Sequence, residues 1–124
     1  MTGYSVSIAK ASRELTAKER IQLKDTTNAI KLDEVTQTEA LIIKPQLFAE
    51  LDIHNEMSDN KDYKNYIVVD GAGQKYVTGS DSFWTSFMDI AREMENETED
   101  WAIKVYRMPS KNYKGKEFIT CSIE

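Results

Sequence analysis

The chain has 124 residues and a formal net charge of −5 at pH 7, with 40% hydrophobic and 30% charged residues, which fits one soluble globular domain. No apolar run approaches the roughly 20 residues that cross a bilayer, and the start of the chain lacks a secretory signal pattern. A single histidine and a single cysteine exclude an internal disulfide and a zinc site. We therefore expect an intracellular protein that binds no membrane, metal or cofactor and is not an enzyme.

The first half of the chain predicts short elements. Apolar and polar residues alternate in Tyr4–Ile8, which predicts a strand. Thr16 and Glu19 have the spacing of a capping box and predict a short helix after them, although the hydrophobic residues there would also suit a strand. Ala40–Lys44 is an apolar run that ends at a proline, as expected for a strand. In Gln46–Asn55 the hydrophobic spacing is closer to that of a helix.

The second half has clearer patterns. Tyr66–Asp70 and Lys75–Thr78 are β-rich and are separated by a glycine-rich turn, which predicts a hairpin. From about Asp81 to Glu95, apolar residues recur at helical spacing. Trp101–Arg107 and Lys116–Ile123 predict two further strands joined by a lysine-rich loop. The aromatic residues expected on the buried face of the helix are Phe83, Trp84 and Phe87.

The order of these elements predicts a mostly β protein with one or two helices. A helix between the third and fourth strands of a five-stranded barrel is the arrangement of the OB-fold, and an α+β sandwich of the same elements is the alternative. We expect residues 1–124 to form a single domain. Residues 1–35 would be an N-terminal extension, or the first strand and a short helix.

Charge is divided unevenly along the chain. Residues 1–32 carry six basic and three acidic side chains, residues 33–100 carry five and sixteen, and residues 101–124 carry five and two. The local charges are therefore +3, −11 and +3. Such asymmetry suggests a polyanion or a complementary protein surface as the partner.

The last two predicted strands supply a candidate binding site. Their alternation places Lys104, Tyr106 and Phe118 on one face, opposite the aliphatic residues. Aromatic rings that stack on bases, together with cations that follow the phosphates, are typical of proteins that bind single-stranded nucleic acid. Alternatively, the two rings form a cross-strand pair beneath another element. The candidate nucleic-acid-binding residues are Lys104, Tyr106, Arg107, Lys111, Tyr113, Lys114, Lys116 and Phe118.

The same region resembles a known family. The segment Trp101–Ile123 reads WAIKVYRMPSKNYKGKEFITCSI and resembles the C-terminal hairpin of small single-stranded DNA-binding proteins of bacteriophages of Gram-positive bacteria. The similarity extends to Lys24–Lys31 and Tyr76–Ser80. The resemblance implies an OB-fold protein that coats single strands during phage replication or recombination. It further implies a homo-oligomer, with phage or host replication proteins as partners, in the cytoplasm of the infected bacterial host.

A phage interaction or inhibitor protein is the alternative, with the acidic middle of the chain mimicking nucleic acid. The position of the C-terminal lysines distinguishes the two functions. An open groove that they share with Tyr106 and Phe118 would favour DNA binding. Direct pairing with the carboxylates of residues 89–100 would favour the acidic interaction protein. The lysines concerned are Lys104, Lys111, Lys114 and Lys116.

Overall fold

A computed structural model describes residues 3–124, which form two compact units. The first unit contains the chain up to Ile30 and Gln46–Gly79, and the second contains Lys31–Pro45 and Ser80–Glu124. Within the described residues, no helix is long and apolar enough to cross a membrane. The two units are described separately below.

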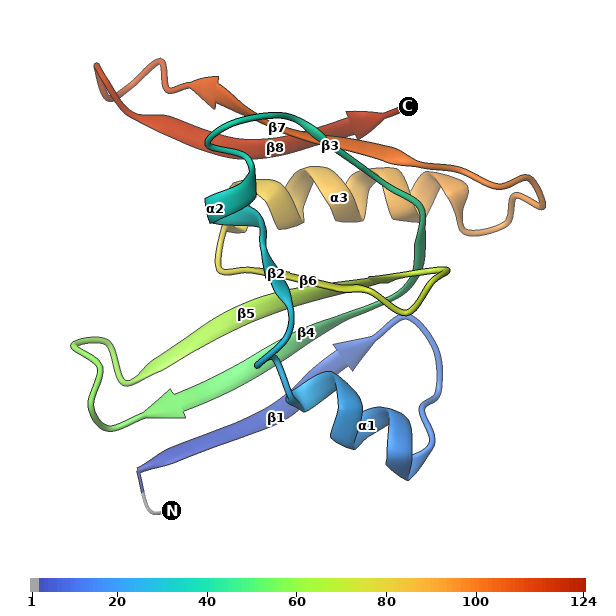
Figure 1. The fold of residues 1–124 in the computed structure, drawn as a ribbon, viewed down its shortest axis with the longest axis vertical. Helices are drawn as coiled ribbons and strands as arrows, with labels where there is room; N and C mark the ends of the chain where they lie inside the picture. Colours follow the sequence, from blue (N-terminus) through green and yellow to red (C-terminus); the bar gives the residue numbers. More distant parts are fainter. Residues whose placement is uncertain (1–2) are drawn as a thin grey trace. The chain divides into compact units, whose positions relative to one another are not determined.

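The first unit is built on a five-stranded sheet (Figure 1). The strand order is β1-β4-β5-β6-β2, so that β1 lies at one edge and is joined to the sheet only through β4. The strands are β1 (Tyr4–Ala11), β2 (Ile30–Lys31), β4 (Pro45–Asn55), β5 (Asp62–Asp70) and β6 (Lys75–Thr78). The predictions of a strand at Tyr4–Ile8 and of the hairpin now seen as β5 and β6 are confirmed.

The prediction of helical structure in Gln46–Asn55 is wrong, because this segment is strand β4. Every second side chain of the strand is buried, from Leu47 through Ala49 and Leu51 to Ile53. That is a strict strand period. Phe48 lies between two of these positions on the opposite face and is only half-buried. Because Phe48 is apolar but lies on the less buried face, the sequence of β4 does not show a regular alternation of apolar and polar residues.

Helix α1 (Ala17–Lys24) begins at the predicted capping box. The backbone N–H of Glu19 donates to Thr16 Oγ1 over 3.1 Å, and Thr16 N–H donates to Glu19 Oε1 over 2.9 Å. Leu23 is the buried residue of the helix and joins a hydrophobic cluster with β4 and β5. At the other end, Lys75 Nζ donates to the carbonyl oxygen of Gln22 over 2.8 Å, where a cation suits the helix C-terminus.

The second unit contains a three-stranded sheet and two helices. Its strands are β3 (Leu41–Ile43), β7 (Ile103–Pro109) and β8 (Glu117–Ile123), in the order β3-β7-β8. Its helices are α2 (Leu32–Val35) and α3 (Asp81–Met94). The strand predicted at Ala40–Lys44 and the two C-terminal strands are confirmed.

Helix α3 confirms the amphipathic segment predicted from about Asp81. Ser80 Oγ caps it by accepting from the N–H of Phe83 over 3.2 Å. Phe83 and Phe87 have 0% exposure, whereas Trp84 is only half-buried. The ring centroids of Phe87 and Trp84 are 5.3 Å apart. Two of the three aromatic residues are therefore core residues, and the third is partly accessible.

The fold class is α+β, with mostly β structure. Within residues 3–124 the strands form two separate hydrogen-bonded sheets and no closed barrel, so the predicted OB-fold barrel is not observed. The decisive pairings join β1 to β4 and β3 to β7. They connect segments far apart in the chain, which local alternation cannot reveal.

Candidate nucleic-acid interface

Strands β7 and β8 form an antiparallel hairpin whose register fixes which side chains share a face. Val105 lies opposite Cys121, and Tyr106 lies opposite Thr120. Directly opposed residues point to the same face, and neighbours along a strand point to opposite faces. One face therefore carries aliphatic side chains and the other carries Tyr106. The buried residues of the aliphatic face are Ile103, Val105, Ile119 and Cys121.

Cys121 is a free, buried thiol in this aliphatic face. Burial raises the pKa of the Cys121 thiol to about 12. Because the thiolate is the reactive form of cysteine, this side chain is an inert core residue. On the same face, Ile119 is buried, whereas Ile123 at the end of the strand is 51% exposed.

The opposite face of the hairpin, here called the outer face, carries Lys104, Tyr106 and Phe118 together, as the alternation predicts. Phe118 pairs directly with Met108 and not with Tyr106, so the two rings are diagonal neighbours. Phe118 is 37% exposed and Tyr106 is half-buried. The two rings are therefore not directly opposed, and Phe118 is not fully covered by another element.

Two exposed hydrophobic residues of the outer face were missed by the sequence analysis. Met108 is 42% exposed beside Phe118, and Ile42 of β3 is 48% exposed beside Lys104. The prediction ended the strand at Arg107, one residue before Met108. Continuing the alternation by one residue would have placed Met108 on the outer face.

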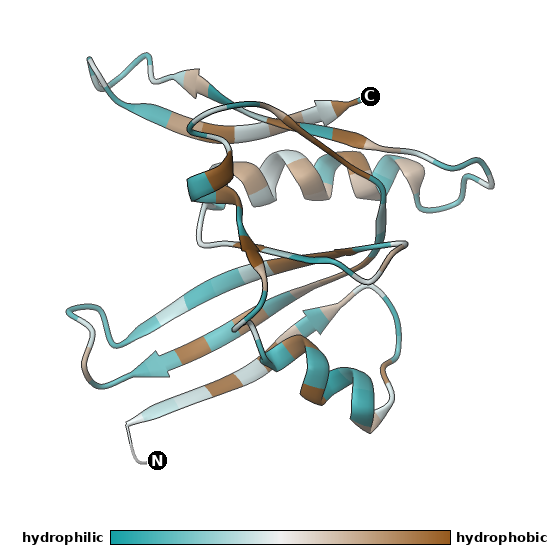
Figure 2. Cartoon of the chain, viewed as in Figure 1, coloured by the Kyte–Doolittle hydropathy of each residue, from teal (hydrophilic) through white to brown (hydrophobic). Residues whose placement is uncertain are grey.

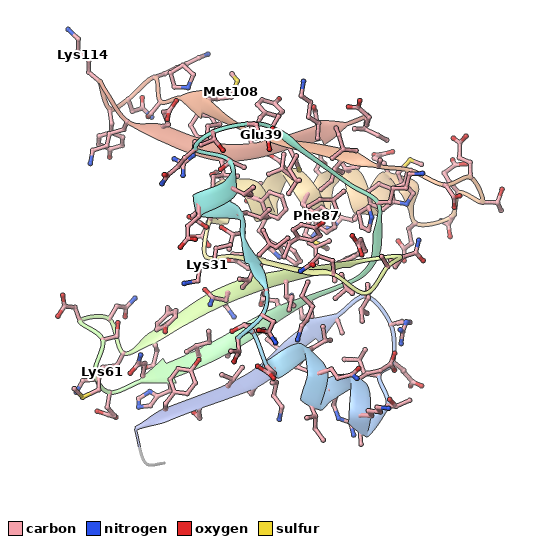
Figure 3. The ribbon with its side chains drawn as sticks, in the orientation of Figure 1. Lys31, Glu39, Lys61, Phe87, Met108 and Lys114 are labelled. Carbon is pink, nitrogen blue, oxygen red and sulfur yellow. The ribbon has the colours of Figure 1, made fainter. Side chains whose placement is uncertain are left out.

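The loop between β7 and β8 is held in a compact turn. Ser110 N–H donates to Lys116 O over 2.8 Å, and Lys116 N–H donates to Tyr113 O over 3.1 Å. Gly115 has a φ of +80°, a conformation that favours glycine. These bonds present the side chains of residues 111–114 to solvent, and Lys114 points away from the end of the loop (Figure 3).

An open hollow of about 700 Å³ lies where the loop meets the strands. Four of the predicted site residues line it, namely Lys111, Tyr113, Lys116 and Phe118. The carboxylate of Glu117 also lies in the lining. Lys104, Tyr106 and Lys114 do not line the hollow, so the predicted residues form a face and an adjoining hollow rather than one groove.

Arg107 does not belong to the outer face. It lies opposite Ile119, on the aliphatic side of the hairpin. Its Nε donates to Thr36 Oγ1 over 3.2 Å, and its guanidinium also donates to the carbonyl oxygen of Asp33. Arg107 therefore holds the end of α2 against β7. The sequence offered no signal for this contact, because it joins positions 71 and 74 residues apart.

Strand β8 is an edge strand of the three-stranded sheet, and helix α3 covers the edge that does not pair with β7. Ser82 Oγ donates to the carbonyl oxygen of Ile119 over 2.8 Å, and the hydroxyls of Ser86 and Thr120 are 2.9 Å apart. A covered edge cannot pair with another strand. The accessible parts of the hairpin are therefore its outer face and its loop.

The two loops that flank β7 carry opposite charge. Residues 95–100 precede the strand and include four carboxylates, whereas the loop after it carries Lys111, Lys114 and Lys116. Both loops are exposed and hydrophilic (Figure 2). Among the ion pairs described for residues 3–124, none involves these three lysines, Lys104, or a carboxylate of residues 89–100. Within the described residues, the lysines are thus not paired directly with that acidic segment.

The single histidine lies in the first unit. His54 Nδ1 is 2.7 Å from Asp62 Oδ1, and Nε2 is 2.6 Å from Glu56 Oε1. Hydrogen bonds to Asp62 and then to Glu56 raise the pKa of His54 above its usual 6.5. In the described part of the chain, no group of three or more His, Cys, Asp or Glu side chains could hold a metal ion.

No family model matches the chain, and neither a curated protein nor a solved structure with significant similarity was found.

Proposed function

We propose that the protein binds single-stranded DNA through the outer face of the β7–β8 hairpin and the adjoining loop. The observation that carries this proposal is the placement of an exposed and a half-buried aromatic ring beside lysines that have no carboxylate partner among the ion pairs described for residues 3–124. Tyr106 and Phe118 share the outer face with Lys104. The hollow beside Phe118 adds Lys111 and Lys116.

The geometry suits unpaired bases better than a duplex. A ring stacks on the flat face of a base, and that face is accessible only when the base is not already stacked in a helix. Tyr106 and Phe118 are diagonal neighbours on an antiparallel pair, which places them about 7–8 Å apart. Two bases over these rings would belong to an extended strand. Their phosphates would then lie near the lysines.

The proposal does not need a closed OB barrel, because the three-stranded sheet alone carries the candidate residues. Arg107 is left out of the proposed contact set, since its guanidinium is bound to α2. The resemblance to bacteriophage proteins supplies the biological setting that we propose, namely coating of single strands during phage replication or recombination in the host cytoplasm.

A fluorescence-anisotropy titration with a labelled oligothymidine at several salt concentrations tests the proposal. Each phosphate contact contributes about 0.7 to the slope of log affinity against log salt, so losing three contacts should flatten the slope by about 2. The test variant replaces Lys111, Lys114 and Lys116 with Ala. The matched control makes the same charge change in the first unit, at Lys10, Lys18 and Lys24, which are also exposed.

Two results would contradict the proposal. One is the absence of binding by the wild-type protein at low salt and micromolar concentration. The other is an equal loss of slope in the control, which would show that overall charge rather than the loop sets the affinity. A labelled duplex of the same length should bind more weakly than the single strand, because its bases are not free to stack.

Stacking has a separate signature. Replacing Phe118 with Ala should weaken binding by about 1–3 kcal/mol, with little change of the salt slope, because a ring releases no counterions. Replacing Phe118 with Trp should retain binding, since an aromatic face is kept. If Phe118→Ala and Phe118→Trp bind equally, Phe118 does not stack on a base.

The acidic segment supports a second candidate function. The carboxylates of residues 95–100 are exposed and are not part of any ion pair described within residues 3–124. Such a surface suits a basic protein partner that normally binds nucleic acid. If the oligonucleotide titration shows no binding, an interaction or inhibitor protein that uses this segment becomes the favoured function.

A further inference from the structure

We propose that strand β1 pairs antiparallel with β1 of a second copy of the chain, around a two-fold axis at Val6. The five-stranded sheet of the first unit has β1 as one of its two edge strands. Within the described residues, no strand pairs with the free side of β1. An open edge presents backbone N–H and C=O groups that can bind another strand. The proposal concerns the first unit alone and is independent of DNA binding.

The hydrogen bonds around β4 show which backbone groups of β1 face outward. Glu56 N–H donates to Gly3 O over 2.6 Å, towards β1, and Asn55 N–H donates to Lys61 O over 2.7 Å, in the opposite direction. In an antiparallel pair this direction alternates along each strand. Ser5 and Ser7 therefore bond to β4. The groups that point to the open edge belong to Tyr4, Val6 and Ile8.

The side chains of β1 are symmetric about the same residue. The strand begins Tyr-Ser-Val-Ser-Ile, so an antiparallel pair centred on Val6 places Ser5 opposite Ser7 of the second copy and Tyr4 opposite Ile8 of the second copy. Apolar residues thus meet apolar residues, and hydroxyls meet hydroxyls. Natural edges are commonly protected by charged residues or proline. The first charged residue of this strand is Lys10, beyond a bulge after Ile8.

The bulge in β1 limits how many residues can pair with the second copy, and so limits the affinity of the dimer. Register shifts between Ile8 and Lys10, so the regular edge extends only from Tyr4 to Ile8. Pairing over this length forms about six backbone hydrogen bonds. The interface is small compared with those of stable dimers, which bury more than about 1,000 Å² in total. We therefore expect a reversible dimer with a dissociation constant in the micromolar range.

Charge substitutions at the two exposed serines test both the interface and its register. Ser5→Lys combined with Ser7→Lys places lysines opposite each other across the axis, and like charges in direct opposition destabilise a strand pair. Ser5→Glu combined with Ser7→Lys places opposite charges there instead. Within one chain Ser5 faces His54 and Ser7 faces Asp52, so the second variant also suits the monomer. Unfolding curves would verify that both variants fold.

Analytical ultracentrifugation gives the readout. The wild-type mass should rise with concentration towards twice 14.2 kDa. The double-lysine variant should raise the dissociation constant at least about tenfold, and the glutamate–lysine variant should stay close to the wild type. The proposal is overturned if the wild type stays monomeric at about 100 μM, if the double-lysine variant dimerises normally, or if both variants lose the dimer equally.

A cross-link tests the axis directly. Opposed residues of a hydrogen-bonded antiparallel pair have Cα atoms about 5.5 Å apart, within disulfide reach. Val6→Cys should therefore form a covalent dimer on mild oxidation. Ile8→Cys is the matched control, because the two Ile8 residues would be four positions apart, about 13 Å. Equal cross-linking of both variants would show that the axis does not pass through Val6.

Discussion

Replacing Phe87 with Ala should be the most damaging single change in the second unit. The side chain has 0% exposure, and its ring lies 5.7 Å from Phe83, 5.3 Å from Trp84 and 6.3 Å from Trp101 between centroids. Truncation of a buried phenylalanine costs about 3–5 kcal/mol. Three ring contacts are lost as well, so we expect the upper half of that range. With a denaturant slope of about 2 kcal/mol per molar, the urea midpoint falls by about 2 M.

Urea unfolding followed by circular dichroism measures this loss, with Phe87→Leu and Trp84→Ala as comparison variants. Phe87→Leu keeps most of the apolar volume and should cost about 1–2 kcal/mol. Trp84 is half-buried, so Trp84→Ala should cost less than Phe87→Ala. A loss below about 1 kcal/mol for Phe87→Ala, or a larger loss for Trp84→Ala, would refute the assignment of Phe87 as the centre of the aromatic cluster.

Two further predictions concern titrating side chains. Because the pKa of His54 is raised in the folded protein, its contribution to the free energy of unfolding is complete below about pH 6.5 and disappears as the pH rises through the raised value. The urea midpoint of the wild type should therefore exceed that of His54→Gln by more at about pH 5.5 than at about pH 8.5. An equal difference between the two midpoints at both pH values would contradict the ion-pair geometry. Burial raises the pKa of Cys121 to about 12, so a disulfide reagent at pH 8 should modify the thiol only after unfolding. Rapid modification of the native protein would show that the aliphatic face opens.

Local patterns predicted most elements of the chain but not how they pair. The capping box at Thr16 and the amphipathic segment that forms α3 are local signals, and both helices occur where expected. Strand β4 was missed because the alternation of its buried residues was masked by Phe48. The two-sheet arrangement depends on pairings such as that of Tyr4 with Asn55. No period within either segment specifies that partner.

The candidate interface was predictable to the extent that strand alternation determines it. Lys104, Tyr106 and Phe118 share one face because their strands alternate regularly and run antiparallel. Arg107 was included for its charge alone, and its hydrogen bonds to α2 could not be inferred from a pattern. The hollow beside Phe118 arises from the conformation of the loop. The sequence shows which residue types the loop contains, but it does not show that they enclose a hollow.

The opposite charges of the two loops at the ends of β7 form a large local electric dipole. The strand has seven residues, a length of about 23 Å, with three lysines beyond one end and four carboxylates before the other. Such a separation corresponds to a moment on the order of 300 debye, against about 3.5 debye for one peptide unit. In the field of a polyanion, this charge separation would favour the orientation of the second unit in which the lysine loop faces the polyanion. The net charge of −5 would oppose the approach of a polyanion, so only the direction of approach would be favoured by this charge separation.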